Sequence, residues 1–453
     1  MSLRWIRERL EEFRGREALI EGETTLTYDE LIDQVDQLAE RFRSWGVAAG
    51  DCFAFMGDYS IPNVTRFVTA LVEGLVAVPI AVKAADEVAR ALEAVPRDWY
   101  AGADCRLDQA SERILPATRH PLLEKLRQRR HPGIVILSSG STGTPKVVLQ
   151  DASMLLERFR HPRNAYRSLV FLLPDHIGGV NNLFSMLTCG STLVIPKNRT
   201  PEEICELIES RKVSSIPVTP TFLNLLLISG AHKEYDLSSL KVISYATEVM
   251  PQPTLEAATK AFPGVRFVQI YGSSELGVFR CKSKDSASAF VSLKGDGVEL
   301  QIREGRLWVK GMDSMLGYLS GEPSGFDEDG WYDTGDVVVE EDGYYRFLGR
   351  ASELINVGGQ KVYPTEVESA LMSLEGVQEC SVFGAQHVLT GQVVAARVKL
   401  STDESARAFK GRMRRALAAR LESFKIPVVV TLGDSVISHR FKKMRRLAGE
   451  GEQ

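Results

Sequence analysis

The sequence predicts an α/β fold: a large N-terminal domain with mostly parallel, helix-covered sheets and a β-rich subdomain, then a small C-terminal α+β domain. Three observations lead to it. Strands alternate with helices from about residue 131 to 275, which is typical of parallel sheets covered on both faces. Short alternating runs with Asp-Gly turns fill residues 295–348. The pattern changes again after Gly349-Arg350, so we expect two domains, residues 1–350 and 351–453.

The composition is that of an ordinary globular protein. The 453 residues are 44% hydrophobic and 25% charged, and the net charge of −4 gives no electrostatic reason to expect nucleic acid as a partner. The six cysteines are scattered, so neither a zinc site nor a disulfide framework is indicated. The charged, amphipathic start, Met1–Leu10, differs from a signal peptide, and no apolar stretch is long enough to span a membrane. These features favour the reducing cytoplasm.

The first 130 residues predict mixed elements. Asp51–Gly57 and Ala70–Ile80 indicate a strand–helix–strand unit, whereas residues 83–130 are polar and predict helices. In the last hundred residues, helices are expected at Pro364–Met372 and 405–421, and strands near 379–383 and 393–400.

The region from 131 to 275 is the most regular. Its expected strands are Ile134–Leu137, Ser168–Leu173, Ser191–Ile195, Lys241–Tyr245 and Val265–Ile270. Thr200, Pro201 and Glu203 have the order of an N-cap, a first-turn proline and a capping-box glutamate.

Four polar or aromatic positions follow expected strands directly. Ligands of parallel sheets bind beyond the carboxyl ends of the strands. Ser138, His176, Ala246 and Tyr271 are therefore expected to meet at one site.

The stretch from Ser138 to Lys146 has the composition of a phosphate-binding loop. It carries hydroxyls, two glycines and a lysine, and glycines let the backbone approach an anion closely. It is not a Walker A loop, because Pro145 precedes Lys146 and Val147 follows it. A Ser/Thr/Gly surface turn is the alternative. The candidate phosphate-binding residues are Ser138, Ser139, Gly140, Ser141, Thr142, Gly143, Thr144 and Lys146.

This loop resembles the phosphate loop of the adenylate-forming superfamily, which contains the acyl-CoA synthetases, the adenylation domains of peptide synthetases and the luciferases. Further motifs resemble the same superfamily in the same order, out to Arg445. The resemblance implies a mobile C-terminal domain, with the active site between the two domains.

Tyr271-Gly272-Ser273-Ser274-Glu275 resembles the superfamily's Tyr-Gly-x-Thr-Glu motif. An aromatic ring can stack on adenine, and a carboxylate can hold Mg²⁺ between phosphates. A Gly-Ser turn with a solvated glutamate is the alternative. The resemblance implies that Tyr271 flanks adenine and that Glu275 is the magnesium ligand. Ser274, in the threonine place, is a catalytic candidate, and Gly272 and Ser273 are nucleotide-binding candidates.

Two further segments are candidates for the nucleotide. Trp331 to Asp336 resembles the family's Tyr-x-Thr-Gly-Asp motif, in which Asp336 takes the ribose diol. An exposed acidic turn is the alternative. Arg350 of Gly349-Arg350 is implied to contact ribose or phosphate. Ala246, Thr247 and Glu248, after the Lys241–Tyr245 strand, complete the nucleotide-binding candidates.

Pro174 to Gly179 resembles the His-x-Gly-Gly segment of acyl-CoA synthetases, which implies that His176 orients the acyl carboxylate. A structural histidine is the alternative. Amino-acid-activating relatives carry aspartate where Ile177 stands, so an α-ammonium would lie buried and unpaired here. The neighbouring Asp175 keeps this point open. The walls of the acyl pocket are expected from His176–Met186, Tyr245-Ala246 and Tyr271–Gly277.

The C-terminal domain carries two more motifs. The run from Ile355 to Glu368, with Gly358 and Gly359, resembles the loop that lines the pantetheine tunnel, and many relatives carry lysine where Asn356 stands. A plain Gly-Gly turn before a helix is the alternative. Ser438 to Arg445 resembles Thr-x-x-Gly-Lys-x-x-Arg, so Lys442 aligns with the lysine that bridges carboxylate and α-phosphate. Lys443 is a rival by adjacency, and a solvated basic tail is the alternative.

The resemblance implies an acid–thiol ligase that uses ATP, Mg²⁺ and coenzyme A. A carboxylic acid, fatty or aryl rather than an α-amino acid, would form acyl-AMP with release of pyrophosphate, and a thiol would then displace AMP. One alternative is an acyl-AMP ligase that loads the phosphopantetheine of an acyl or peptidyl carrier protein. Another is a non-catalytic nucleotide-binding protein on the same fold.

Overall fold

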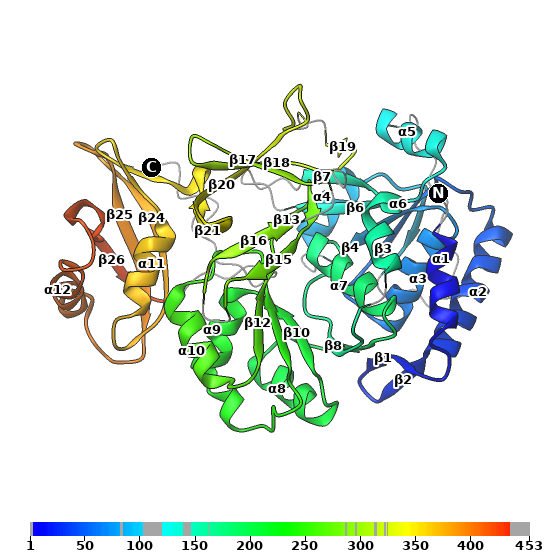
Figure 1. Ribbon diagram of the computed structural model, residues 1–453, viewed down its shortest axis with the longest axis horizontal. Helices are drawn as coiled ribbons and strands as arrows, with labels where there is room; N and C mark the ends of the chain where they lie inside the picture. The colour runs from blue at the N-terminus through cyan, green and yellow to red at the C-terminus, as the bar shows by residue number, and fades with distance from the viewer. Residues whose placement is uncertain are drawn as a thin grey trace.

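The computed structural model describes residues 3–81, 85–102, 120–138, 146–161, 163–285, 288–294, 297–311, 315–320, 323 and 325–434. The small C-terminal domain lies at one end of the molecule and the N-terminal helices at the other (Figure 1). None of the described helices is long and apolar enough to cross a membrane.

Two sheets form the body of the N-terminal domain. One sheet is parallel apart from its last pair and follows the order β12 (Arg266–Gln269), β11 (Val242–Tyr245), β10 (Ser215–Val218), β8 (Arg167–Leu169), β9 (Thr192–Ile195), β1 (Glu17–Glu21) and β2 (Thr24–Thr27). The other follows the order β19 (Gly317–Tyr318), β7 (Lys146–Asp151), β6 (Gly133–Ser138), β4 (Val76–Ile80), β3 (Cys52–Met56) and β5 (Trp99–Ala101). In this second sheet β7 runs antiparallel to both of its neighbours, and the remaining pairs are parallel.

Helices separate and cover the two sheets. The described α-helices of this domain are α1 (Arg4–Glu11), α2 (Tyr28–Trp45), α3 (Ile61–Val72), α4 (Ala85–Ala94), α5 (Pro121–Arg129), α6 (Ala152–Glu157), α7 (Ile177–Leu187), α8 (Pro201–Ser210), α9 (Pro220–Ser229) and α10 (Gln252–Ala261). The β6 strand shows how they are arranged, because its side chains alternate between two cores. Ile134 and Ile136 pack with α3 and α7, whereas Val135 and Leu137 pack on the side of α5. A third core lies between the first sheet and α8, α9 and α10.

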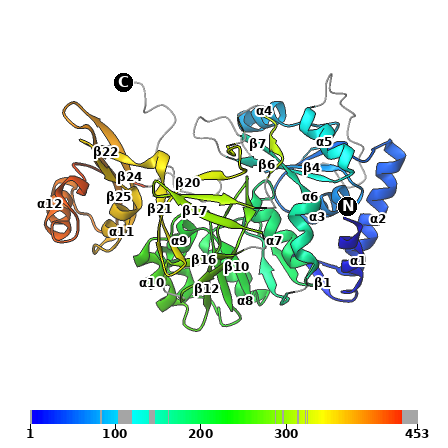
Figure 2. The same cartoon turned by 45° about the horizontal axis from the view of Figure 1, so that its top comes forward.

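The β-rich subdomain is an antiparallel sheet in the order β15 (Arg280–Ser283), β16 (Val291–Lys294), β21 (Tyr344–Arg350), β20 (Tyr332–Glu341), β18 (Arg306–Lys310) and β17 (Glu299–Arg303). A short hairpin of β13 (Gly272–Ser273) and β14 (Gly277–Val278) precedes it. Figure 2 shows this subdomain between the small domain and the rest of the body.

The C-terminal domain follows a 3₁₀ turn at Ala351–Glu353. Its elements are β22 (Ile355–Val357), β23 (Gln360–Val362), α11 (Pro364–Met372), β24 (Val377–His387), β25 (Gly391–Leu400), α12 (Ala406–Leu417) and β26 (Val429–Leu432). They enclose a core of their own, with Phe409 and Met413 of α12 fully buried. The amide of Asn224 donates to the carbonyl of Gln378 across the two domains, at 3.0 Å.

The structure corrects several expected elements. β5 lies in a region expected to be helical, and β8 ends at Leu169 rather than Leu173. The Thr200 hydroxyl caps α8 as expected, but the Glu203 carboxylate accepts the N–H groups of Lys197 and Asn198 and does not complete a capping box.

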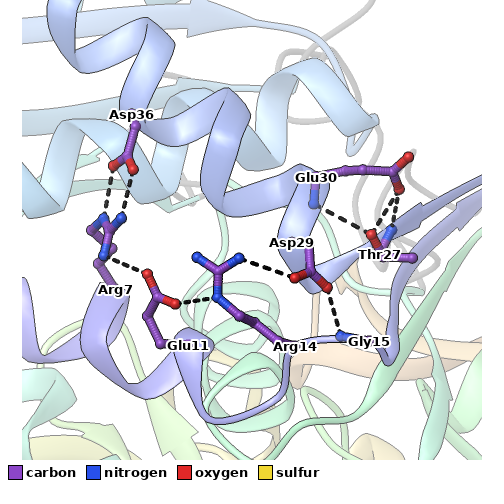
Figure 3. Close-up of polar contacts among 8 residues, drawn as sticks. All are labelled: Arg7, Glu11, Arg14, Gly15, Thr27, Asp29, Glu30 and Asp36. Atoms are coloured by element: carbon purple, nitrogen blue, oxygen red, sulfur yellow. Dashed lines mark hydrogen bonds and ion pairs between the residues drawn. The ribbon is translucent and has the colours of Figure 1, made fainter.

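A network of ion pairs joins α1 to α2 (Figure 3). Arg7 binds both carboxylate oxygens of Asp36, at 2.7 and 2.5 Å, and also Glu11 at 2.9 Å. Arg14 contacts Glu11 and Asp29. At the start of α2, Thr27 and Glu30 form a complete capping box. The arginines lower the pKa of Asp36 and Glu11 through hydrogen bonds.

We predict that the Arg7–Asp36 pair stabilises the fold at neutral pH and less in acid. Because the pKa of Asp36 is lowered in the folded state, its contribution is present above the usual pKa of 3.8 and is lost as the pH falls through the lowered value. Both side chains are partly exposed, so Asp36→Asn should cost at most about 1 kcal/mol. Thermal melts at pH 7 and about pH 2, on the two sides of the window in which the contribution is lost, check this, with the exposed Asp33→Asn on the same helix as control. An equal loss at both pH values would contradict it.

Candidate active site

A pocket opens where the first sheet meets α7. It has about 510 Å³ of empty space, which includes a part open to solvent. Its described lining comes from three stretches: Leu172 and His176–Gly178 with Asn181 and Asn182; the strand ends Pro217-Val218 and Ser244–Thr247; and Ile270, Gly272 and Val278. The three walls expected from the sequence all contribute to it.

The first turn of α7 is packed so closely that it requires glycine. A Cβ at Gly179 would lie 1.9 Å from the carbonyl oxygen of Leu173, which no side chain tolerates. At Gly178 a Cβ would meet the Leu172 side chain at 2.8 Å. His176 is the N-cap of this helix, and its Nδ1 accepts the N–H of Gly178 at 3.0 Å. This bond assigns the ring proton to Nε2, so His176 can act as a donor through Nε2.

Asp175 does not serve as a wall of the pocket. It is fully buried, and its Oδ2 accepts the N–H of Ala81 at the end of β4, at 3.3 Å. The described lining contains Ile177 but not Asp175. The described lining of the pocket therefore contains no carboxylate that could pair with the α-ammonium group of an amino acid.

The two sheets join at this pocket. Ser138 ends β6 in the second sheet, whereas β8, β11 and β12, whose ends lead to His176, Ala246 and Tyr271, belong to the first. The expectation that these strands belong to one parallel sheet was therefore wrong, whereas the meeting of the four residues at one site stays a prediction. The amide of Leu137 donates to the carbonyl of Asp175 at 3.1 Å, which brings the end of β6 beside the segment that leads to α7.

Ser138 and Lys146 face each other across the β6–β7 pair. The candidate residues Ser139, Gly140, Ser141, Thr142, Gly143 and Thr144 between them lie outside the described residues. Lys146 Nζ lies 5.1 Å from the centre of the Tyr318 ring, a cation–π contact.

Glu275 is held by the second sheet. Its Oε1 accepts the hydroxyl of Tyr318 at 2.9 Å, and its carbonyl accepts the N–H of Met315 at 2.7 Å. The amide of Gln150 in β7 donates to the carbonyl of Ser274. Ser273 uses its hydroxyl to accept the N–H of Leu276, and Ser274 is buried. Burial raises the pKa of Tyr318, so its hydroxyl remains a donor.

Asp336 lies at the centre of a second polar cluster. Its Oδ2 accepts the hydroxyl of Tyr271 at 2.8 Å, and its Oδ1 pairs with Arg350 Nε at 2.8 Å. Asp336 and Arg350 are directly opposite in the β20–β21 ladder, so the hairpin fixes this pair. Burial raises the pKa of Asp336, and Arg350 and the Tyr271 hydroxyl oppose that rise.

The Tyr271 ring is packed among protein aromatic rings. It stacks on Phe347 at 4.5 Å and on Phe279 at 5.6 Å between ring centres, and it is 9% exposed. Gly272, the next residue, lines the pocket, and a Cβ there would meet the carbonyl of Gly277 at 2.4 Å. The peptide bond between Tyr271 and Gly272 therefore connects the Asp336 cluster to the pocket.

The loop after β11 contains a strained residue. Thr247 has φ of +78°, which is rare for a β-branched side chain, and its buried hydroxyl has no hydrogen-bond partner among the described residues. Glu248 points to α9, where it accepts the N–H and hydroxyl of Thr221 at 3.2 and 2.6 Å. Ala246 and Thr247 line the pocket.

The C-terminal candidates lie apart from the pocket or outside the described chain. Gly358 and Gly359 form the β22–β23 turn, and the described pocket lining does not include them. Gly358 N donates to the Thr390 carbonyl at 2.9 Å, and Gly359 N donates to Asn356 Oδ1 at 2.8 Å. Lys442 lies outside the described residues.

Asn181 and Asn182 fall within the predicted wall His176–Met186 but were not singled out, and Tyr318 was not predicted as a site residue. Asn181 and Asn182 line the pocket one turn beyond Gly178, and helical periodicity could have placed all three on one face. Tyr318 had no such signal, since its partner Glu275 lies 43 positions earlier in the chain.

The residues fit the groups that the motifs imply. A carboxylate offers about four acceptor positions. Asp336 uses two of them on Tyr271 and Arg350, which leaves others for a diol. The described residues contain no group of three or more His, Cys, Asp or Glu side chains placed to hold a metal ion. A single glutamate still suits Mg²⁺, which is usually bound by one or two carboxylates together with substrate phosphates.

Solved structures share this architecture. An anthranilate CoA ligase, AuaEII, in complex with anthranoyl-AMP superposes with a TM-score of 0.81 at 19% identity, over 97% of this chain and 95% of the other. The amide bond synthetase McbA from Marinactinospora thermotolerans gives 0.79 at 20% identity, over 98% of both chains. The fold class predicted from the sequence is confirmed.

Curated relatives match over nearly the whole chain. The indoleacetate–CoA ligase of Aromatoleum aromaticum is 26% identical over 95% of this chain and 94% of its own length. A 2-succinylbenzoate–CoA ligase of Bacillus licheniformis is 26% identical over 98% of both.

Family models cover both domains. The model of the AMP-binding enzyme family matches residues 6–319, and that of the AMP-binding enzyme C-terminal domain matches residues 366–440. The resemblance drawn from the motifs is confirmed, and the chain belongs to the AMP-binding enzyme family.

Proposed function

We propose that this protein is an AMP-forming acid–thiol ligase that activates a small carboxylic acid as acyl-AMP and transfers the acyl group to coenzyme A. The observation that carries this proposal is the junction at Tyr271-Gly272. On one side lies a pocket for an acyl group, and on the other the Asp336–Arg350 pair suited to a ribose. The CoA ligases among the relatives are named for indoleacetate and 2-succinylbenzoate, which favours an aryl acid over a fatty acid.

The chemistry requires activation because a free carboxylate is a poor electrophile. When bound, Mg·ATP supplies the α-phosphorus and the pyrophosphate leaving group. Asp336 accepts the ribose hydroxyls and Arg350 contacts the ribose or a phosphate. Glu275 holds the metal ion, and the hydroxyl of Tyr318 orients that carboxylate.

The acid is positioned by α7 and the strand ends. His176 donates from Nε2 to the acyl carboxylate, and Ile177 supplies an apolar wall. The segment from Ser138 to Lys146 holds the phosphates, and Lys442 stabilises charge that develops at the α-phosphorus. Gly358 and Gly359 admit the pantetheine arm once the C-terminal domain, residues 351–453, has turned about the Ala351–Glu353 segment.

The first experiment measures pyrophosphate release with Mg·ATP across benzoate- and phenylacetate-type acids, fatty acids and α-amino acids, with and without coenzyme A. We expect release that requires an acid, prefers aryl acids and turns over repeatedly only with coenzyme A. Release without any gain from coenzyme A would favour a carrier protein as acceptor. No release with any acid would contradict ligase activity.

The raised pKa of Asp336 predicts how nucleotide affinity depends on pH. As the pH falls, this carboxylate gains its proton at a higher pH than an ordinary aspartate with pKa 3.8, so the KM for ATP should rise early in acid. Asp336→Asn should raise this KM about 10- to 100-fold at neutral pH, as expected for a lost charged hydrogen bond, and flatten the profile.

Two variants should move that profile in opposite directions. Tyr271→Phe removes a hydrogen bond that lowers the pKa of Asp336, so the inflection should shift to higher pH. Asp333→Asn removes a like charge and should shift it to lower pH. Profiles of the KM for ATP that coincide in all three proteins would exclude Asp336 as the titrating group.

The Tyr318–Glu275 hydrogen bond predicts a magnesium phenotype. Tyr318→Phe should raise the Mg²⁺ concentration needed for half-maximal pyrophosphate release several-fold, because the carboxylate loses the group that orients it. Glu275→Gln should have the larger effect, with a loss of about 100-fold in kcat/KM. Tyr344→Phe, in β21 of the β-rich subdomain, is the control. An unchanged Mg²⁺ requirement in Tyr318→Phe would show that the contact does not serve the metal.

A further inference from the structure

One face of α7 contributes two asparagines to the lining of the pocket. Gly178, Asn181 and Asn182 are spaced three and four residues apart, so they share a side of the helix, and all three line the pocket. Two neighbouring residues on the other side of the helix, Val180 and Leu183, are fully buried in the core between the two sheets. The helix therefore separates an apolar side from a polar side, and the polar side faces the ligand.

The Asn182 amide is an unused donor. Its Nδ2 is buried and has no hydrogen-bond partner among the described residues. Buried polar groups in folded proteins are nearly always paired, so an orphaned donor at a functional site requires an explanation, and a hydrogen bond to the bound ligand provides one. The hydroxyl of Thr247, which lines the same pocket, is orphaned as well among the residues that the structure describes.

The lining carries no fixed charge. Among its described residues there is no lysine, arginine, aspartate or glutamate, and the polar members are amides, hydroxyls and His176. The guanidinium of Arg158 donates to the backbone carbonyl of Val278, a lining residue. A second carboxylate on the acid would thus meet no cation among the described lining residues, which is strongly unfavourable.

The position of Asn182 along α7 determines how far it lies from His176, and so from the carboxylate of the acid. It lies six residues beyond His176, and an α-helix rises 1.5 Å per residue, so the two differ by roughly 9 Å along the helix axis. His176 is assigned to the carboxylate of the acid. Asn182 therefore lies where the far side of an aromatic acid would reach.

We propose that Asn182 is a specificity-determining residue, and that the acid is an aryl monocarboxylate with a neutral hydrogen-bond acceptor, such as a carbonyl or ether oxygen, distant from its carboxylate. This inference rests on the proposed ligase function and narrows its substrate class. The proposed substrate therefore differs from an acid with two carboxylates, because the group that binds Asn182 must be uncharged. The amide of Asn182 donates to that oxygen, and the apolar walls enclose the ring.

The test uses acids of matched shape on the benzoate and phenylacetate scaffolds, with an acetyl, an isopropyl or a carboxylate group at the meta or para position. On the scaffold that turns over fastest, the acetyl acid should exceed the isopropyl acid about 10-fold in kcat/KM for pyrophosphate release, the scale of one hydrogen bond to a buried donor. The dicarboxylate should be the poorest of the three.

Asn182→Leu keeps the branched heavy-atom skeleton and removes the donor, so the acetyl preference should disappear while the isopropyl acid is retained. Asn182→Asp, which keeps the shape but cannot donate when ionised, should also lose the preference. Thermal melts establish that each variant is folded, and Asn182→Ser serves if the leucine variant is not. The same acetyl preference in wild type and variants, or efficient turnover of the dicarboxylate, would overturn the proposal.

Binding of the same acids by isothermal titration calorimetry separates this inference from the ligase function. If no acid releases pyrophosphate, the ligase function fails, yet an acetyl preference in binding that Asn182→Leu abolishes still supports the pocket assignment. Binding that ignores the acetyl group in wild type overturns it, whatever the activity.

Discussion

The close approach of α7 to Leu173 is the constraint on which the site depends. Gly179 allows the helix to begin against the carbonyl of Leu173, where any Cβ would collide with it. This contact sets the start of the helix directly after His176 and thereby fixes which residues face the pocket. The end of β6 is attached to the same segment through the Leu137–Asp175 hydrogen bond. Two sheets that share no strand are thus brought to a common edge.

Each sheet contributes a different part of the chemistry. The first sheet and α7 form the pocket, whereas the second sheet holds Glu275 through Tyr318 and places Lys146 opposite Ser138 in the β6–β7 ladder. The β-rich subdomain adds Asp336 and Arg350 as a cross-strand pair. The short motif from Tyr271 to Glu275 lies where these three parts meet, because Tyr271 contacts Asp336, Gly272 lines the pocket and Glu275 contacts Tyr318. This position explains why such a short motif includes so many of the candidate functional residues.

Much of the fold was predictable from the sequence because it depends on local patterns. The strands at Ile134–Leu137 and Lys241–Tyr245 were predicted within a residue or so, and α11 was predicted with its observed bounds. The division into two sheets was not predictable, because it is decided by which strands pair and not by their individual patterns. β5 was missed since three residues carry too little periodicity. In the site, Asp336 and Arg350 were found by motif, but their direct pairing depends on hairpin register. The Tyr318–Glu275 contact depends on tertiary structure alone.

The turn at Gly358-Gly359 shows how the residue at position 356 can change the interactions of the loop. Asn356 accepts the N–H of Gly359, and an ammonium group has no lone pair with which to do the same. A lysine there, as in many relatives, would leave this N–H to another partner. The asparagine side chain stabilises the turn by a hydrogen bond within it, whereas a lysine side chain would present a positive charge to a bound group. In this chain the side chain at this position stabilises the shape of the loop, so we expect its part in the predicted thiol capture to be geometric rather than electrostatic.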